Sequence, residues 1–296
     1  MAYSIKANIS DDISFSDFIK NINKKLIPGK INTLIDCATD IQKLANNREF
    51  LIKFIHSELD KLSDFQNKNT HSAQTLVLYG NKNFYFRVNI WPPLSKRKEI
   101  SDWQKSIFVY EQPHDHNFSF LTVGYLGGGY ETEIWEYDYS KVNGNVGEKV
   151  DMKFLEKTSL VKGKAMIYRK STDIHSQFPP NDYTISLNIM PFETTLIQHE
   201  QFYFDLNKKI ITGITPSGAT GRYFITELAS AFGGSKIYNK LETISNKHSN
   251  PFLRLKCFDA MSIINKENSL DIWKKALTNK SKFIAEIAKK RLQKIR

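Results

Sequence analysis

Apolar residues recur at helical spacing over the first part of the chain. Between residues 13 and 66 an apolar side chain returns every three or four positions in three successive stretches. Pro28 and Gly29 separate the first two stretches, and Asn47 stands before the third, where its side chain can accept from a free backbone N–H. The pattern predicts three helices, the first with apolar positions at Phe15, Phe18, Ile19, Ile22 and Leu26.

From about residue 74 to residue 205 the pattern changes to short β-branched and aromatic runs separated by Gly, Asn and Pro. Runs of this kind are typical of strands, and about eight of them at this spacing indicate a sandwich or barrel. Glycines such as Gly163 stand between runs, where turns need positive φ. The expected strands are TLVLYG, NFYFRVNIW, SIFVYEQ, FSFLTVGYL, YETEIWEYDY, LVKGKAMIYR, TISLNIM and QFYFDL.

After Pro216-Ser217-Gly218 the helical spacing returns and continues to Arg296. Two periodic stretches, near 251 to 265 and 281 to 295, flank a shorter one at 270 to 277, an arrangement that is similar to a HEAT-type repeat. One or two such repeats cannot bury both faces, so we expect this tail to pack on the barrel or on a second subunit or protein partner. The predicted organisation is N-terminal helices over 1–70, a barrel over 71–210 and a helical extension over 211–296.

Composition supports a folded, largely β protein. The 296 residues are 41% hydrophobic and 12% aromatic, which excludes disorder of the whole chain and suits pleated surfaces. Cys37 and Cys257, the two cysteines, fall in helical stretches, so neither a disulfide framework nor a Cys-based zinc site is expected. The first residues lack a signal-peptide pattern, and no apolar run reaches the roughly 18 residues of a membrane span. We expect a cytoplasmic protein.

The chain carries a net charge of +11, mostly from dispersed lysines. A basic surface attracts polyanions, but the dispersion favours a solvated face over a nucleic-acid site. The densest basic run comprises Lys289, Lys290, Arg291, Lys294 and Arg296.

Three histidines are candidate ligands of a metal ion. In YEQPHDHNFSF, His114 and His116 are two positions apart, which on a strand places both rings on one face and turns Asp115 toward the other, where it supports a ligand or meets solvent. About 60 residues later, IHSQFPPNDYTISLNIM offers His175 as a third ligand. Imidazoles suit Fe, Zn, Cu and Ni, and three of them leave coordination positions open. The other histidines are interpreted as structural, with the last of the four kept as a reserve ligand: His56, His71, His248 and His199.

Arg87, on an expected inward strand position, is costly to bury without an anion and matches a carboxylate, either that of a substrate or that of a structural ion pair. Tyr85 shares its face and is either a hydrogen-bond donor to substrate or an ordinary barrel aromatic. Glu131 and Glu133 share a face of the following strand, where either one supports a histidine or meets solvent.

With these blocks in place, the chain resembles the cupin superfamily, and within it the three-histidine thiol dioxygenases typified by cysteine dioxygenase. FYFRVNIW resembles the strand that bears a Tyr and a carboxylate-binding Arg, here Tyr85 and Arg87. PHDHNFSFLTVGYLGGGYETEIWEYD and DIHSQFPPNDYTISLNIMPF resemble the blocks with the iron ligands. The resemblance spans about residues 30 to 205 and implies a mainly β fold, a cupin jelly-roll barrel with helical flanks, holding one Fe(II) per chain, with Zn, Mn or Ni as alternatives.

The chain departs from the family at several positions. Phe120 and Leu121 stand where the commonest cupin pattern has a Glu ligand, so a three-histidine site is expected. Leu121 and Met190 occupy the positions of the Cys–Tyr crosslink of animal-type cysteine dioxygenases, and Asn188 falls where that family has a His. The pocket, in which Asn188 and Met190 are expected, must therefore differ, and cysteine is in doubt as the substrate.

Three functions follow from this interpretation. The first is a non-heme Fe(II) oxygenase that uses O₂ on a small carboxylate-containing molecule, such as an amino acid or a thiol acid. The second is a metal-dependent cupin isomerase, lyase or decarboxylase without redox chemistry. The third is a metal-free binding protein whose basic helical tail carries the function.

Overall fold

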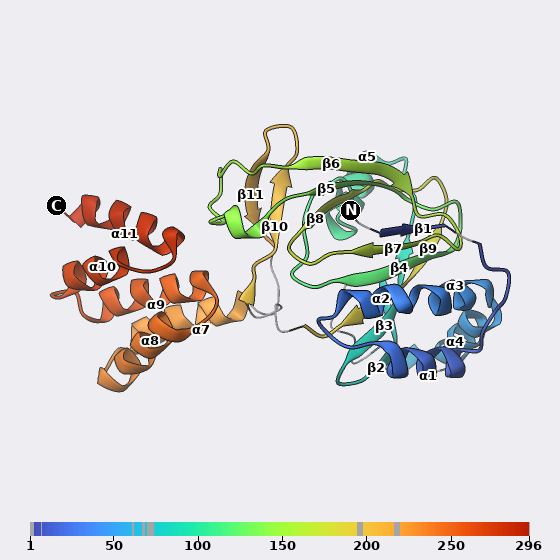
Figure 1. Cartoon of the computed structure of the whole chain (residues 1–296), viewed down its shortest axis with the longest axis horizontal. Coiled ribbons are helices and arrows are strands. Elements are labelled where there is room, and N and C mark those ends of the chain that lie inside the picture. Colours follow the sequence, from blue (N-terminus) through green and yellow to red (C-terminus); the bar gives the residue numbers. More distant parts are fainter. Residues whose placement is uncertain are drawn as a thin grey trace.

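The computed structural model describes residues 3–6, 8–60, 62–66, 69, 74–193, 198–215 and 220–295. His71 and the Pro216-Ser217-Gly218 break lie outside these residues. Figure 1 shows a central pair of sheets, N-terminal helices against one side, and C-terminal helices beyond one end.

Two antiparallel sheets form the centre of the molecule. The larger has the strand order β1-β7-β4-β9-β3-β2 and the smaller the order β6-β5-β8. The strands of the larger sheet are β1 (Tyr3–Ile5), β2 (Thr75–Gly80), β3 (Phe84–Trp91), β4 (Phe120–Leu126), β7 (Ala165–Tyr168) and β9 (Thr184–Pro191). Those of the smaller sheet are β5 (Glu131–Glu136), β6 (Lys153–Ser159) and β8 (Asp173–Gln177). A separate hairpin comprises β10 (Phe202–Asp205) and β11 (Ile210–Ile214).

Alternation along the strands gives the larger sheet two apolar faces. Leu121 and Val123 of β4 belong to the core beneath the N-terminal helices, whereas Phe120 belongs to a second core that also contains Ile134 of β5. Because Ile134 comes from the smaller sheet, the two sheets face each other across this second core. The sequence predicted a sandwich or barrel, and the structure is a sandwich of two antiparallel sheets with helices on its outer side.

The N-terminal helices pack on the outer face of the larger sheet. The second predicted stretch forms two helices rather than one, because the chain turns at Cys37. The N-cap position of the last helix is Arg48 and not Asn47 as predicted, but Oδ1 of Asn47 still accepts from the free backbone N–H of Phe50 at 3.2 Å. The helices are α1 (Phe15–Lys25), α2 (Ile31–Asp36), α3 (Ala38–Asn46) and α4 (Glu49–Leu59), followed by a 3-10 turn at Leu62–Asp64.

The strand prediction was wrong for SIFVYEQ. Its first residues end helix α5 (Lys98–Ile107), and Tyr110 forms only an isolated bridge to Gln177. The helix presents its apolar residues at helical spacing, which the short β-branched run concealed. Strands β1, β6, β8 and β11 were also missed. β6 reads KFLEKTS, which is largely polar and partly exposed, so it carries little strand signal.

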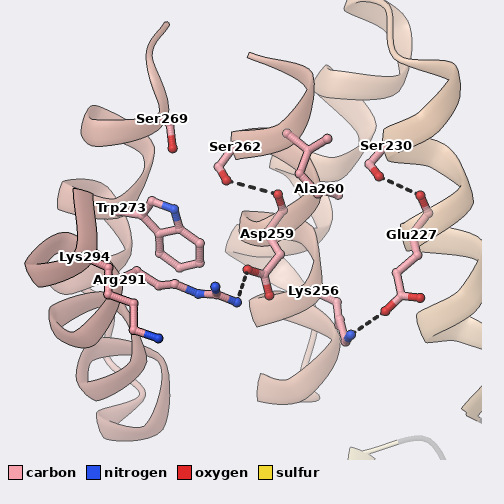
Figure 2. A pocket seen from close by; sticks show the side chains of 11 residues that line it. Glu227, Ser230, Lys256, Asp259, Ala260, Ser262, Ser269, Trp273, Arg291 and Lys294 are labelled. Carbon is pink, nitrogen blue, oxygen red and sulfur yellow. Dashed lines mark hydrogen bonds and ion pairs between the residues drawn. The ribbon is translucent and has the colours of Figure 1, made fainter. Parts of the chain in front are cut away.

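The C-terminal part is helical, as predicted, and has its own apolar core around Phe258 and Trp273. A hollow of about 580 Å³ lies between these helices. Figure 2 shows side chains that line it, with ion pairs from Asp259 to Arg291 (2.9 Å) and from Lys256 to Glu227. The helices are α7 (Gly221–Phe232), α8 (Ser235–Lys247), α9 (Pro251–Ile264), α10 (Ser269–Leu277) and α11 (Lys282–Ile295). A HEAT-type repeat and self-association through these helices stay predictions, as do the domain limits, although β11 extends past residue 210.

Among the described helices, none combines the length and apolar character that crossing a membrane requires.

Candidate metal centre

The three predicted histidines come from two chain segments that lie side by side. His175 is in the middle of β8, and His114 exchanges two backbone hydrogen bonds with it, N–H to O at 3.0 Å and 2.9 Å. His114 is an isolated bridge residue and not part of a regular strand, and His116 follows in irregular backbone. The two histidines therefore do not lie on a regular strand, on which the sequence argument relied, but their rings still point to one place.

The ring nitrogens of these histidines converge. Nε2 of His175 lies 3.2 Å from Nε2 of His114 and 3.1 Å from Nε2 of His116. Nitrogens about 2.1 Å from a common ion would lie about 3.0 Å apart at an octahedral angle and about 3.4 Å apart at a tetrahedral one. Both separations fall between these values, so the three side chains form a group that could hold one metal ion.

Hydrogen bonds on the far side of the rings set which nitrogen faces the centre. Nδ1 of His114 donates to the carbonyl oxygen of Gln112 at 2.7 Å, and Nδ1 of His116 lies 2.9 Å from Oε1 of Gln201. Each ring then presents the Nε2 lone pair inward, as a metal ligand must. The amide of Gln177 lies 2.8 Å from Nδ1 of His175, and with its oxygen turned to that nitrogen it fixes the same tautomer.

Electrostatics favours neutral imidazoles at this point. Burial lowers the pKa of His114, and burial together with repulsion from the neighbouring rings holds the pKa of His116 and of His175 well below the usual value. Three neutral rings with converging lone pairs repel one another unless a cation lies between them. The donor set therefore fits a divalent transition metal.

A cavity of about 150 Å³ opens beside the histidines. Arg87 of β3 and Asn188 of β9 line it, and the two are direct cross-strand partners on one sheet face. Nε of Arg87 is buried without a hydrogen-bond partner among the described residues, and burial lowers the pKa of this guanidinium. An anion that enters the cavity would relieve this cost.

The remaining predicted pocket residues lie outside the cavity lining. Tyr85 and Met190 are cross-strand partners one row further along the sheet, where the Tyr85 ring lies 5.5 Å from that of Phe192. Burial raises the pKa of the Tyr85 hydroxyl. Glu133 is paired in register with Ser176, on the face of the smaller sheet opposite His175, and lies 3.7 Å from Lys157. We therefore leave Glu133 out of the proposed site.

Asp115 points away from the histidines, as expected, but it is fully buried and does not reach solvent. Its carboxylate accepts from the Tyr137 hydroxyl and from the Phe202 N–H, each at 2.6 Å. His199, the reserve ligand, stacks on Tyr139 and lies 2.8 Å from Oγ of Ser171 through Nδ1, outside the three-histidine group.

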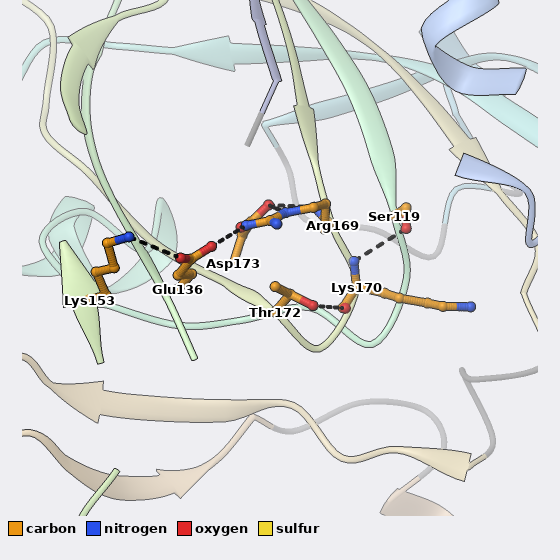
Figure 3. A network of polar contacts seen from close by, with 7 residues as sticks. All are labelled: Ser119, Glu136, Lys153, Arg169, Lys170, Thr172 and Asp173. Carbon is orange, nitrogen blue, oxygen red and sulfur yellow. Dashed lines mark hydrogen bonds and ion pairs between the residues drawn. The ribbon is translucent and has the colours of Figure 1, made fainter. Parts of the chain in front are cut away.

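A polar network fixes the strand that carries His175. Asp173, at the start of β8, accepts from the backbone N–H and the guanidinium of Arg169, which also binds Glu136 of β5 at 3.0 Å (Figure 3). Lys153 of β6 lies 3.9 Å from the same Glu136. The network joins all three strands of the smaller sheet, so the backbone behind His175 is held on both sides.

Sequence reasoning missed several residues of the cavity lining, among them Gln74, Asn89, Trp91, Tyr130 and Gln177. Asn89 and Trp91 follow Arg87 at even spacing, so the alternation that placed Arg87 inward also indicated them. Gln177 follows His175 in the same way. Nothing local indicated Gln74 or Tyr130.

Comparisons with known proteins give only distant likenesses. No protein-family model and no curated protein matches the chain. Solved structures similar to part of it include the DMSP lyase DddQ from Ruegeria pomeroyi DSS-3 (10% identity, TM-score 0.24, 40% of this chain and 46% of that one). Another is the hydroquinone 1,2-dioxygenase from Sphingomonas sp. TTNP3 (8%, 0.29, 44% and 73%). A third is a cupin-2 domain protein from Shewanella frigidimarina NCIMB 400 (12%, 0.24, 45% and 91%). At this level the matches are no guide to activity.

Proposed function

We propose that this chain is a non-heme iron oxygenase of the cupin type. One Fe(II) would be held by His114, His116 and His175, and the substrate would be a small carboxylate-containing molecule that reacts with O₂ in the cytoplasm. The observation that carries the proposal is the convergence of three neutral Nε2 atoms, 3.1 and 3.2 Å apart, beside a cavity lined by Arg87, whose buried Nε has no hydrogen-bond partner among the described residues.

The protein's own groups bind and orient the substrate. Arg87 binds the carboxylate, because its planar fork matches two oxygens and its burial strengthens a charge-assisted hydrogen bond. The cavity of about 150 Å³ is small compared with the roughly 300 Å³ or more of drug-sized sites, which restricts the substrate to a compact acid. A bound iron would supply the activation of O₂, and three protein ligands leave it coordination positions for this chemistry.

Metal analysis tests the ligand set. Protein purified without oxygen should contain about one iron per chain, and His175→Ala should lose most of it, because two of three ligands bind far more weakly. His56→Ala is the matched control, since His56 is an exposed histidine on α4, and its metal content should equal that of the wild type. Equal metal in His175→Ala and the wild type would remove His175 from the site.

Oxygen dependence tests the reaction class. A panel of small amino, hydroxy and thiol acids is screened for O₂ uptake by the iron-loaded protein. Uptake with any member should vanish in His175→Ala. Turnover that continues unchanged without O₂, or with Zn or Mn in place of iron, would identify a non-redox metal enzyme instead.

A further inference from the structure

Three buried polar atoms without hydrogen-bond partners among the described residues belong to residues that line one cavity. They are Oε1 of Gln74, Nε of Arg87 and Nδ2 of Asn188. Buried polar groups are almost always paired, so three unpaired ones around one small space indicate groups that a ligand completes. Two of these atoms are donors and one is an acceptor. A ligand that pairs with all three must therefore carry both a hydrogen-bond acceptor and a hydrogen-bond donor.

The backbone holds these residues in fixed places. Arg87 and Asn188 are adjacent across β3 and β9. The carbonyl oxygen of Gln74 accepts from the N–H of Ile90 on β3 at 2.8 Å, which ties Gln74 to the same strand. Gln74 and Asn188 are 9% and 3% exposed, so neither side chain can turn out to bulk water without moving its neighbours.

The charge of the cavity lining indicates whether the donor group of the ligand is a charged ammonium or a neutral hydroxyl. Among the described residues that line the cavity, the permanently charged side chain is the guanidinium of Arg87, and the others are amides, hydroxyls, rings and the aliphatic Val109. An ammonium group would add a second positive charge beside Arg87 in a desolvated space, whereas a hydroxyl adds none. The lining therefore favours an uncharged donor.

We propose that Gln74 and Asn188 make the site specific for a compact hydroxy acid. Arg87 and Nδ2 of Asn188 bind the carboxylate, and Oε1 of Gln74 accepts from the hydroxyl. This inference rests on the proposed function only for the carboxylate anchor, and it narrows the substrate class from carboxylic acids in general to those with a neutral donor near the carboxylate.

Three acids with the same carbon skeleton test it. Propionate, lactate and alanine differ only by a hydrogen, a hydroxyl or an ammonium at the second carbon, and their affinities for the full-length protein are measured by calorimetry with and without Zn(II). We expect lactate to bind about five- to tenfold more tightly than propionate, the ratio that one net hydrogen bond gives, and alanine to bind more weakly than lactate.

Variants assign the effect to residues. Gln74→Met should reduce lactate to the affinity of propionate, which offers Gln74 no donor and should bind as before. Asn188→Leu should weaken both acids in parallel. Thr122→Val is the matched control, because Thr122 is the cross-strand partner of Asn188 and equally buried but outside the cavity lining, and it should leave the lactate-to-propionate ratio unchanged.

The outcomes separate this inference from the proposed function. A lactate-to-propionate ratio that is the same in Gln74→Met and the wild type would overturn the role of Gln74 while leaving the carboxylate anchor in place. Absence of binding by all three acids would overturn both. If Gln74→Met does not fold, Gln74→Glu replaces it: a carboxylate there should favour alanine over lactate, and an unchanged order would contradict the proposal.

Discussion

At the scale of single residues, the site is built from groups that are unfavourable in isolation. Arg87 places a guanidinium nitrogen in the interior without a partner among the described residues, and the three imidazoles turn their lone pairs toward one another. Such groups reduce stability and are retained at functional sites because a ligand completes them. Replacing such a group should therefore stabilise the folded protein and weaken the binding of the ligand.

Arg87→Met should separate these effects. Removing a desolvated charge while keeping the volume should raise the free energy of unfolding by about 1 kcal/mol or more. The same change should weaken carboxylate binding by about 1.5–3 kcal/mol, which is roughly 10- to 150-fold. Urea unfolding and calorimetry with propionate give the two values. A loss of stability in Arg87→Met would instead indicate that Arg87 is a structural ion-pairing residue.

The two cysteines should be inert in the native protein. Burial raises the pKa of the Cys37 and Cys257 thiols to about 12, so at pH 8 the reactive thiolate is more than about a thousandfold rarer than in a free thiol. Alkylation by iodoacetamide followed by mass spectrometry should show no rapid labelling of the folded chain and full labelling in guanidinium. Rapid modification of either cysteine in the folded state would contradict the buried placement.

At the scale of elements, the segment that leads into β10 supports the three-histidine group from the side away from the cavity. Gln201 binds Nδ1 of His116, the Phe202 N–H donates to Asp115, and Tyr203 bridges to the backbone of His114. The irregular His114–His116 segment is therefore positioned by this strand on one side and by β8 on the other. A ligand segment outside the regular sheets needs such support.

Gln201→Leu should lower metal affinity by about 10- to 100-fold without preventing folding, because it removes the acceptor that fixes the His116 tautomer. Gln201→Glu should keep or increase the affinity, since a carboxylate accepts the same proton. Competition against a chelator of known affinity measures both. If Leu and Glu at this position behave alike, the bond to His116 is not what positions the ligand.

At the scale of the whole molecule, Glu200 joins the sandwich to the helical extension. Its buried carboxylate accepts from the Tyr223 hydroxyl of α7 and from Nδ2 of Asn250 at 2.6 Å, and its own N–H donates to Tyr139. The rings of Phe202 and Phe252 lie 6.2 Å apart at the same junction. Through these contacts the tail packs against the segment around β10, beyond one end of the sandwich (Figure 1).

Glu200→Leu should loosen this junction. It leaves a buried hydroxyl and a buried amide without their acceptor, at an expected cost of about 2 kcal/mol or more in the free energy of unfolding. Glu242→Gln is the control, because its ion pair with Lys275 is half-exposed and should change stability by less than about 1 kcal/mol. Thermal unfolding followed by circular dichroism compares the two variants. Equal melting temperatures would show that the junction contributes little.

The sequence by itself determined the local features of this protein. Alternation along FYFRVNIW placed Arg87 on the inner face, because it depends only on the period of extended backbone. Spacing also identified His114 and His116 as a pair, although the backbone that carries them is irregular. Helical spacing likewise indicated the N-terminal helices and the C-terminal tail.

Tertiary structure decided what depends on pairing between distant segments. The bridge between His114 and His175 brings the third ring within 3.2 Å, and register puts Asn188 beside Arg87. Strand register also places Glu133 on the face opposite His175 and leaves Tyr85 and Met190 outside the cavity lining. Pairing with β3 also places Gln74 at the cavity, since its carbonyl oxygen accepts from the N–H of Ile90. None of these follows from spacing along one segment, because strand register is fixed by the core that the paired strands bury together.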